Sequence, residues 1–162
     1  MEQNKYATFY IGEALFGIDI LLVREINRNI DITPVDLAHE SIRGLINLRG
    51  QLVTIFDLGT LIGLGKTEIT ESTCSIVLKT RSEIHDPSVS ESVREAIGDE
   101  MSGFIVDRIG DIVSAETTQF EAPPASVSGI QRESIDKVVK LKSELLVILN
   151  IATLFAMYKQ NA

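Results

Sequence analysis

The sequence predicts a mainly β protein made of two similar small barrels. Short runs rich in Val, Ile and Leu alternate with turn signals, which favours barrels over a sheet of βαβ units. Hydrophobic residues make up 44% of the 162 residues and aromatic residues only 6%, so the core is aliphatic, as suits strands. The third observation is that parts of the chain occur twice, in the same order.

The main repeat joins residues 48–62 to residues 141–155, a shift of 93 positions. Within it, Arg49 corresponds to Lys142 and Asp57 to Asn150. A second pair of matches supports it: residues 17–20 resemble 103–106, and residues 23–26 resemble 109–112. Such a repeat predicts two similar units in one chain.

The first half of the chain predicts strands at residues 6–11, 15–20 and 22–28. Residues 33–35 are extended, because the residue before a proline avoids the helical region. Asp36 is expected to cap a short helix over residues 37–42, which Gly44 ends. Residues 45–48 and 52–56 predict a hairpin across the turn 49–51, after which Asp57 caps a helical turn. A polar loop then leads to a buried strand at 74–80.

Residues 81–101 interrupt this pattern with an acidic insertion, in which residues 81–100 hold six acids against two bases. Its aliphatic residues are spaced by four and share one face of a helix: Val89, Val93 and Ile97. A capping box of Ser88 with Glu91, and a stop at Gly98, predict a short helix at about 89–97. Since one narrow apolar stripe docks weakly, a disordered insertion is the alternative.

The second half predicts strands at residues 103–106, 112–115, 137–141 and 145–149, with an extended connection at Pro123-Pro124. Asn150 is expected to cap a C-terminal helix over residues 151–160. The expected division is therefore a first barrel at about 13–80 and a second at about 102–150. Strand 6–11 is assigned to the second barrel.

Composition limits the classes of partner. The net charge of −8 argues against nucleic acid, because neutralising phosphates needs clustered Lys and Arg. It equally argues against direct binding to an anionic membrane surface. The N-terminus lacks a signal-peptide pattern, and no apolar run approaches the roughly 20 residues needed to span a bilayer. A soluble cytoplasmic protein is expected.

No pattern in the sequence indicates catalysis. Residues 59–67 look like a phosphate loop, but the glycine required six positions before Lys66 is Thr60. His39 and His85 lack the spacing of metal ligands, and no nucleophile can be matched to a base. The single cysteine, Cys74, lies in an apolar run and is expected to be a buried hydrophobe. The sequence therefore predicts no catalytic residue, no cofactor and no metal.

Two charged residues stand in unusual places. Glu25 interrupts an apolar run, and Arg49 lies in a tight turn beside Gly50. The two could form a charge-assisted pair at one barrel end, oriented for a partner. They could equally form an ordinary surface pair, worth at most about 1 kcal/mol.

At these residues the chain resembles the CheW-like family, the coupling proteins of bacterial chemosensory arrays. The most specific match is the string Gly-Leu-Ile-Asn-Leu-Arg-Gly at residues 44–50. Further matches at 15–20, 23–26, 32–35, 42–43, 103–107, 121–124 and 145–150 extend the resemblance over nearly the whole chain.

The resemblance implies two intertwined five-stranded SH3-like β-barrels with short helices and a hydrophobic groove between the barrels. It also implies an adaptor without catalysis, which binds the cytoplasmic tip of chemoreceptors and the regulatory domain of a CheA-type histidine kinase. Carried over residue by residue, the positions of partner contact are Ile20, Val23, Glu25, Ile26, Gly44 and Arg49. The family joins strands 74–80 and 102–106 by a short turn, so the insertion is expected to add a contact or to block one.

Other functions remain open at this point. A coupling module of a chemosensory system that controls pili or development would have the same sequence features. An enzyme with a site in the groove between the barrels is the alternative from another class. The regulatory part of a larger kinase is disfavoured, because the sequence runs from Met1 to a capped helix with no kinase segment.

Overall fold

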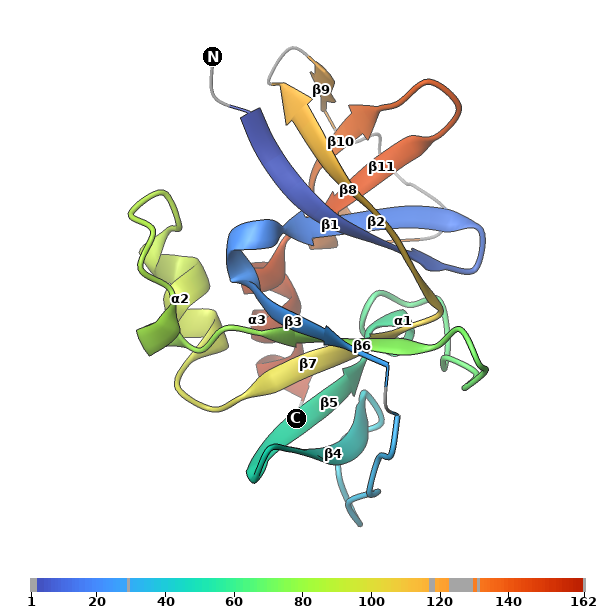
Figure 1. Cartoon of the computed structure of the whole chain (residues 1–162), viewed down its shortest axis with the longest axis vertical. Helices are drawn as coiled ribbons and strands as arrows, with labels where there is room; N and C mark the ends of the chain where they lie inside the picture. The colour runs from blue at the N-terminus through green and yellow to red at the C-terminus, as the bar shows by residue number, and fades with distance from the viewer. Residues whose placement is uncertain (1–2, 29, 117–118, 123–129, 131, 162) are drawn as a thin grey trace.

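The computed structural model describes residues 3–28, 30–116, 119–122, 130 and 132–161, and these form two β-sheets (Figure 1). The five-stranded sheet has the order β3 (Val23–Asn27), β6 (Cys74–Leu78), β7 (Ser102–Val106), β5 (Gln51–Asp57) and β4 (Ile42–Leu48). The six-stranded sheet has the order β8 (Arg108–Glu116), β1 (Gln3–Ile11), β2 (Ala14–Asp19), β11 (Leu145–Leu149), β10 (Ile135–Lys140) and β9 (Phe120–Glu121). The mainly β fold expected from the sequence is confirmed, and the two sheets are consistent with SH3-like barrels.

Short helices connect and flank the sheets. The α-helices are α1 (Leu58–Leu61), α2 (Glu91–Ile97) and α3 (Ile151–Asn161). The 3₁₀ turns are η1 (Ile20–Leu22), η2 (Arg81–Glu83) and η4 (Arg132–Ser134). Figure 1 shows α2 on the outer flank of the molecule, beside the ends of β6 and β7. The expected connection at residues 123–124 lies outside the described residues.

The two sheets repeat one topology. In each, a hairpin (β4–β5 or β10–β11) pairs in parallel with a third strand, β7 or β2. That strand pairs antiparallel with β6 or β1, which in turn pairs antiparallel with β3 or β8. The repeated segments of the sequence thus occupy equivalent strands in two equivalent sheets.

Strand pairing corrects the expected division of the chain at two places. β2 belongs to the six-stranded sheet, although residues 13–80 were assigned to the first barrel. β7 belongs to the five-stranded sheet, although residues 102–150 were assigned to the second. The reason is that β1–β2 and β6–β7 are each antiparallel neighbours, and a division by chain position separates both pairs. The five-stranded sheet therefore uses residues 23–106, and the other sheet uses both ends of the chain.

Three apolar clusters hold the fold together. One lies inside the five-stranded sheet and includes Ile55, Val77 and Ile105. A second lies inside the six-stranded sheet and includes Leu15 and Leu146. The largest fills the space between the sheets, with side chains from both sheets and from α2 and α3. Because β6 and β7 face one cluster on each side, all ten of their residues are buried.

The repeat extends to hydrogen bonds at the helix starts. Asp57 Oδ1 accepts from the Thr60 N–H at 3.2 Å, and Asn150 Oδ1 accepts from the Thr153 N–H at 3.1 Å. The backbone N–H of each capping residue also donates to a buried serine carbonyl, at 2.6 Å for Asp57 and 2.8 Å for Asn150. Both caps were expected from the sequence, and both are present.

The helix expected over residues 37–42 does not form. Leu37 has φ 62° and is fully exposed, and a left-handed residue at that position cannot continue a helical turn. Ile42 instead begins β4. Asp36 therefore caps no helix over residues 37–42. Instead, Thr33 pairs with Leu45 of β4, which holds this part of the chain extended beside the strand.

The insertion contains the expected helix rather than the disordered alternative. α2 carries the predicted apolar face, and Gly98 ends it with φ 71°. The cap is Ser90, whose hydroxyl accepts from the Val93 N–H, and not Ser88. Ser88 instead donates to Asp86 Oδ1 in a tight turn before the helix.

Candidate functional site

An ion pair joins β3 to the β4–β5 turn, where Arg49 donates from Nη2 to Glu25 Oε1. The contact that the sequence suggested between these residues is therefore present. The Arg49 side chain is 66% exposed, so the pair contributes at most about 1 kcal/mol to folding. Its contribution to partner binding stays a prediction.

The turn that carries Arg49 is a two-residue hairpin loop, since Leu48 pairs with Gln51. Arg49 has φ 52° and Gly50 has φ 85°, the left-handed pair of a type I′ turn. Asn47 Oδ1 accepts from the Gly50 N–H at 2.9 Å and fixes the loop. Such turns favour Asn or Gly at the position of Arg49. Holding another residue in the left-handed conformation costs about 1–3 kcal/mol of folding free energy. The backbone conformation therefore does not explain why this position holds an arginine, and the explanation must lie in its side chain.

Strand register separates the partner residues on β3 into two faces. Val23 pairs with Leu78 and Ile26 pairs with Ile76, and both partners belong to the cluster between the sheets. Glu25 pairs with Val77, which belongs to the cluster inside the sheet. A bulge between Val23 and Glu25 puts these residues on opposite faces.

The two faces differ in chemistry. One face of β3 and of the turn before it, on the side of the cluster between the two sheets, is aliphatic. We call this face the β3 strip; it consists of Ile20, Val23 and Ile26. Ile20 and Val23 are partly buried against the core, and Ile26 is 40% exposed. Glu25 and Arg49, with the exposed Leu52 that follows the turn, form a charged barrel end. Sequence reasoning missed Leu52, although its place in an alternating strand signals an outward side chain.

Gly44 has a structural role of its own. It is buried with φ 144°, and a Cβ there would lie 2.2 Å from the carbonyl oxygen of Thr33. The close approach permits the two backbone hydrogen bonds between Thr33 and Leu45, at 2.8 and 2.9 Å. The structure thus gives a packing reason for this glycine, and its part in partner contact stays a prediction.

The second barrel presents an equivalent end. By the repeat, Glu25 and Ile26 correspond to Asp111 and Ile112, and the turn residues Arg49 and Leu52 correspond to Lys142 and Leu145. Ile112 is 65% exposed and Leu145 is 44% exposed. Each barrel therefore exposes an isoleucine on one edge strand and a leucine after its hairpin turn.

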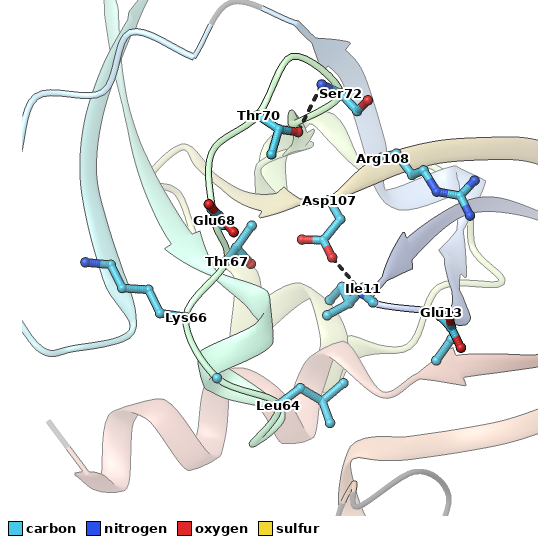
Figure 2. Close-up of a pocket in the computed structure, with 13 residues that line it drawn as sticks. Ile11, Glu13, Leu64, Lys66, Thr67, Glu68, Thr70, Ser72, Asp107 and Arg108 are labelled. Atoms are coloured by element: carbon cyan, nitrogen blue, oxygen red, sulfur yellow. Dashed lines mark hydrogen bonds between the residues drawn. The ribbon is translucent and has the colours of Figure 1, made fainter.

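A pocket of about 790 Å³ lies between the β1–β2 turn and the loop that follows α1 (Figure 2). Two of its charged residues, Asp107 and Arg108, already make structural contacts. Asp107 Oδ2 accepts from the Gly12 N–H at 2.6 Å, and the Arg108 guanidinium lies 3.6 Å from the centre of the Tyr10 ring. The Lys66 side chain extends away from Asp107 in Figure 2. The first contact ties the β7–β8 connection to the β1–β2 turn, and the second lies within the six-stranded sheet. Neither contact assigns a chemistry to the pocket.

Groups suited to other functions were also located. Within the described part of the chain, no three His, Cys, Asp or Glu residues are placed to hold a metal ion. Cys74 is buried, as expected, and burial raises the pKa of its thiol. His39, expected at the surface, is half-buried with its ring edge-on to Tyr158 at 5.4 Å. None of the helices described could span a membrane.

Comparison with known proteins decides the family. The model of the CheW-like domain matches residues 5–159, almost the whole chain. The chain belongs to the CheW-like family. A chemotaxis protein CheW of Treponema pallidum is 30% identical over 155 residues, covering 96% of this chain and 84% of that protein. The chemotaxis protein CheW of Klebsiella aerogenes is 26% identical over 153 residues, covering 94% and 82%.

A solved structure supports the assignment. The crystal structure of the scaffolding protein TtCheW from Thermoanaerobacter tengcongensis has a TM-score of 0.75 to this chain, with 25% identity. The match covers 95% of this CheW-like chain and 88% of that protein. The two-sheet fold and the family therefore agree.

Proposed function

We propose that this CheW-like chain is a non-catalytic cytoplasmic adaptor that couples chemoreceptor tips to a CheA-type histidine kinase. Its relatives carry the names chemotaxis protein and scaffolding protein, which supports this role. The observation that carries the proposal is the separation of the partner residues into the β3 strip and the charged barrel end. An adaptor needs two surfaces that can be occupied at once, and opposite faces of one strand supply them.

The β3 strip suits the receptor tip. A helical hairpin docks by inserting aliphatic side chains between aliphatic side chains of its partner, with polar groups at the rim. Ile20, Val23 and Ile26 offer such a strip along the seam between the sheets. Ile20 and Val23 are held partly buried against the core, so little side-chain entropy remains to be lost when a helix covers them.

The charged barrel end suits the kinase regulatory domain. Arg49 is held by Glu25 in a defined direction on a rigid two-residue turn, and Leu52 adds an exposed aliphatic side chain. Arginine is one of the residues that most often carry the binding energy of a protein interface. The equivalent end of the second barrel, with the exposed Lys142 and Leu145, gives the adaptor a second contact of the same kind.

Isothermal titration with each partner separately tests this assignment. Arg49→Ala is expected to weaken binding of the kinase regulatory domain by roughly 1–3 kcal/mol, the range for a lost charged hydrogen bond, and to leave receptor binding unchanged. Ile26→Ser is expected to do the opposite, because it removes exposed aliphatic area from the β3 strip. Wild-type protein that binds neither partner would reject the proposed function.

A further inference from the structure

The insertion is an addition to one barrel only. In the six-stranded sheet, β1 and β2 are joined by the two-residue turn Gly12-Glu13. The equivalent strands of the other sheet, β6 and β7, are joined by residues 79–101. Because the equivalent strands β1 and β2 are joined by only two residues, a connection as long as the insertion is not needed to form the barrel.

The insertion is organised by its own contacts. Arg94 on α2 donates to the backbone carbonyls of Ile84, Asp86 and Val89, which fixes the loop before the helix. At its base, the Arg81 N–H donates to the Gly98 carbonyl at 2.8 Å, so the two ends of the insertion meet. The segment is therefore a closed unit with a defined shape.

The unit docks on the molecule through its apolar face and leaves a polar face beside the β3 strip. Ile84, Val89 and Ile97 are buried in the cluster between the sheets, and α2 packs against α3. Glu83 at the start of the insertion lies 3.7 Å from Arg24 on β3. The insertion therefore touches β3, the strand that carries Val23 and Ile26 of the β3 strip.

A concavity of about 470 Å³ lies where the insertion meets the strip. Its lining combines the aliphatic Ile20 and Leu21 with Asp86 and Ser88 of the insertion. Asp19 and the β1 residues Asn4 and Lys5 complete the lining. The lining is acidic, because it holds the carboxylates of Asp19 and Asp86 but only one ammonium group, that of Lys5. The strip itself remains open, since Ile20 and Val23 are only partly buried.

Asp86 is held as a fixed, ionised group. Its Oδ1 accepts from the Ser88 N–H at 2.9 Å and from the Ser88 hydroxyl at 2.7 Å. The Ser88 hydroxyl bond, then its backbone bond, hold the pKa of this carboxyl below its usual range. A carboxylate in a fixed position beside aliphatic side chains favours a cation carried next to an aliphatic side chain.

We propose that the insertion adds an acidic wall to the β3 strip and selects a helical partner that carries a Lys or Arg next to its aliphatic anchor. On a helix, residues three or four positions apart share a face, so an aliphatic residue can cover Ile20 while the cation reaches Asp86. The inference rests on the proposed receptor contact and specifies its chemistry.

A matched pair of neutral variants tests the wall. Asp86→Asn removes the charge but keeps an oxygen acceptor for Ser88. Glu95→Gln is the control, because Glu95 lines a different pocket, which residues of α2 and α3 form. The probes are purified receptor-tip hairpins and the purified kinase regulatory domain, titrated at low and at high salt.

Asp86→Asn is expected to weaken receptor-tip binding roughly two- to fivefold at low salt, the range for one partly exposed ion pair, and to reduce its salt dependence. Glu95→Gln and kinase binding are expected to stay unchanged. A chain in which Arg81 is joined directly to Gly98 is expected to lose the same part of the affinity. Wild-type receptor binding in both Asp86→Asn and this deletion would overturn the inference but leave the proposed function standing. Tighter binding by the deletion would also overturn it, since the insertion would then block the strip.

Discussion

At the scale of single residues, Arg49 occupies a backbone position that its side chain does not favour. The left-handed turn position suits Asn or Gly, and the ion pair with Glu25 is too exposed to repay the conformational cost through folding. Residues whose strained backbone conformation is not offset by stabilising contacts are often found at functional positions. We therefore propose that Arg49 serves a partner interface and not the stability of the fold.

Exchanging Arg49 for Asn separates these two roles. Asn tolerates the left-handed conformation, so the free energy of unfolding is expected to stay within about 1 kcal/mol of the wild-type value. Affinity for the kinase regulatory domain is expected to fall by roughly 1–3 kcal/mol. Urea unfolding and titration measure the two quantities. Arg81→Ala, which removes the exposed ion pair with Glu91 in the insertion, is the control and should change neither quantity appreciably. A fall in stability without a fall in affinity for Arg49→Asn would contradict the assignment.

Asp57 has the opposite character, because it is fully buried and entirely occupied within the fold. It accepts from Arg43 Nη1 at 3.0 Å, from the Thr67 N–H at 2.9 Å and from the Thr67 hydroxyl at 3.0 Å. Asp57→Asn is expected to destabilise the protein by about 3–5 kcal/mol, since Arg43 loses its buried partner. Asn150→Ser, at the equivalent cap, is expected to cost less than about 1 kcal/mol. Equal losses in urea unfolding would contradict this difference.

Much of the residue detail follows from the sequence, and the failures have physical causes. The Glu25–Arg49 contact and both Asp57 and Asn150 caps follow from spacing and repeat. That Glu25 faces away from Val23 and Ile26 does not, because this orientation depends on a bulge at Arg24 that no local pattern signals. Likewise, the left-handed Leu37 follows from a pairing with β4 that is formed only in the folded chain.

At the scale of elements, the insertion depends on one side chain. Arg94 holds three backbone carbonyls of residues 84–89, whereas Arg81 makes an exposed ion pair with Glu91. Arg94→Met is expected to lower the local stability of the insertion by about 2–3 kcal/mol, and Arg81→Met by less than about 1 kcal/mol. Hydrogen exchange at residues 82–98 measures both. Equal protection in the two variants would show that the apolar stripe alone orders the segment.

Acidification is expected to loosen the same segment. Hydrogen bonds from Thr80 hold the pKa of Glu83 below its ordinary value of 4.5, and those from Ser88 hold the pKa of Asp86 below 3.8. Because both are lowered in the folded state, their stabilising effect is complete above the ordinary values and is lost as pH falls through the lowered ones. Exchange at residues 80–88, corrected for its intrinsic pH dependence, should therefore accelerate below about pH 4 relative to α3. Thr80→Val removes one hydrogen bond to Glu83 and should therefore reduce the part of the acceleration that protonation of Glu83 causes. If exchange in the wild-type protein does not accelerate at low pH, protonation of these two carboxylates does not loosen the segment.

The sequence predicted this element well where its signals were local. The spacing of Val89, Val93 and Ile97 identified the helix and its buried face, and Gly98 identified its end. The cap moved from Ser88 to Ser90 because Asp86 captured Ser88 in a turn. The anchoring by Arg94 could not be predicted, since its three acceptors are backbone groups brought together only by the folded loop.

At the scale of the whole molecule, duplication accounts for both the fold and the proposed function. Two equivalent sheets enclose one common core, and each exposes aliphatic side chains at an edge strand and after a hairpin. The order of the repeated segments predicted this duplication. The assignment of strand 6–11 to the second barrel agrees with its place in the six-stranded sheet. The sequence did not reveal that β2 joins this sheet and β7 the other, because parallel pairs such as β2–β11 join residues far apart in the sequence.

The most direct test of the account is whether one chain holds both partners at the same time. Sedimentation of the protein with a kinase regulatory domain and a receptor-tip hairpin, each present in excess, measures this. The separation of the β3 strip from the barrel end predicts a ternary complex, with each affinity unchanged by the other partner. Mutually exclusive binding, in which the receptor tip displaces the kinase domain, would contradict it.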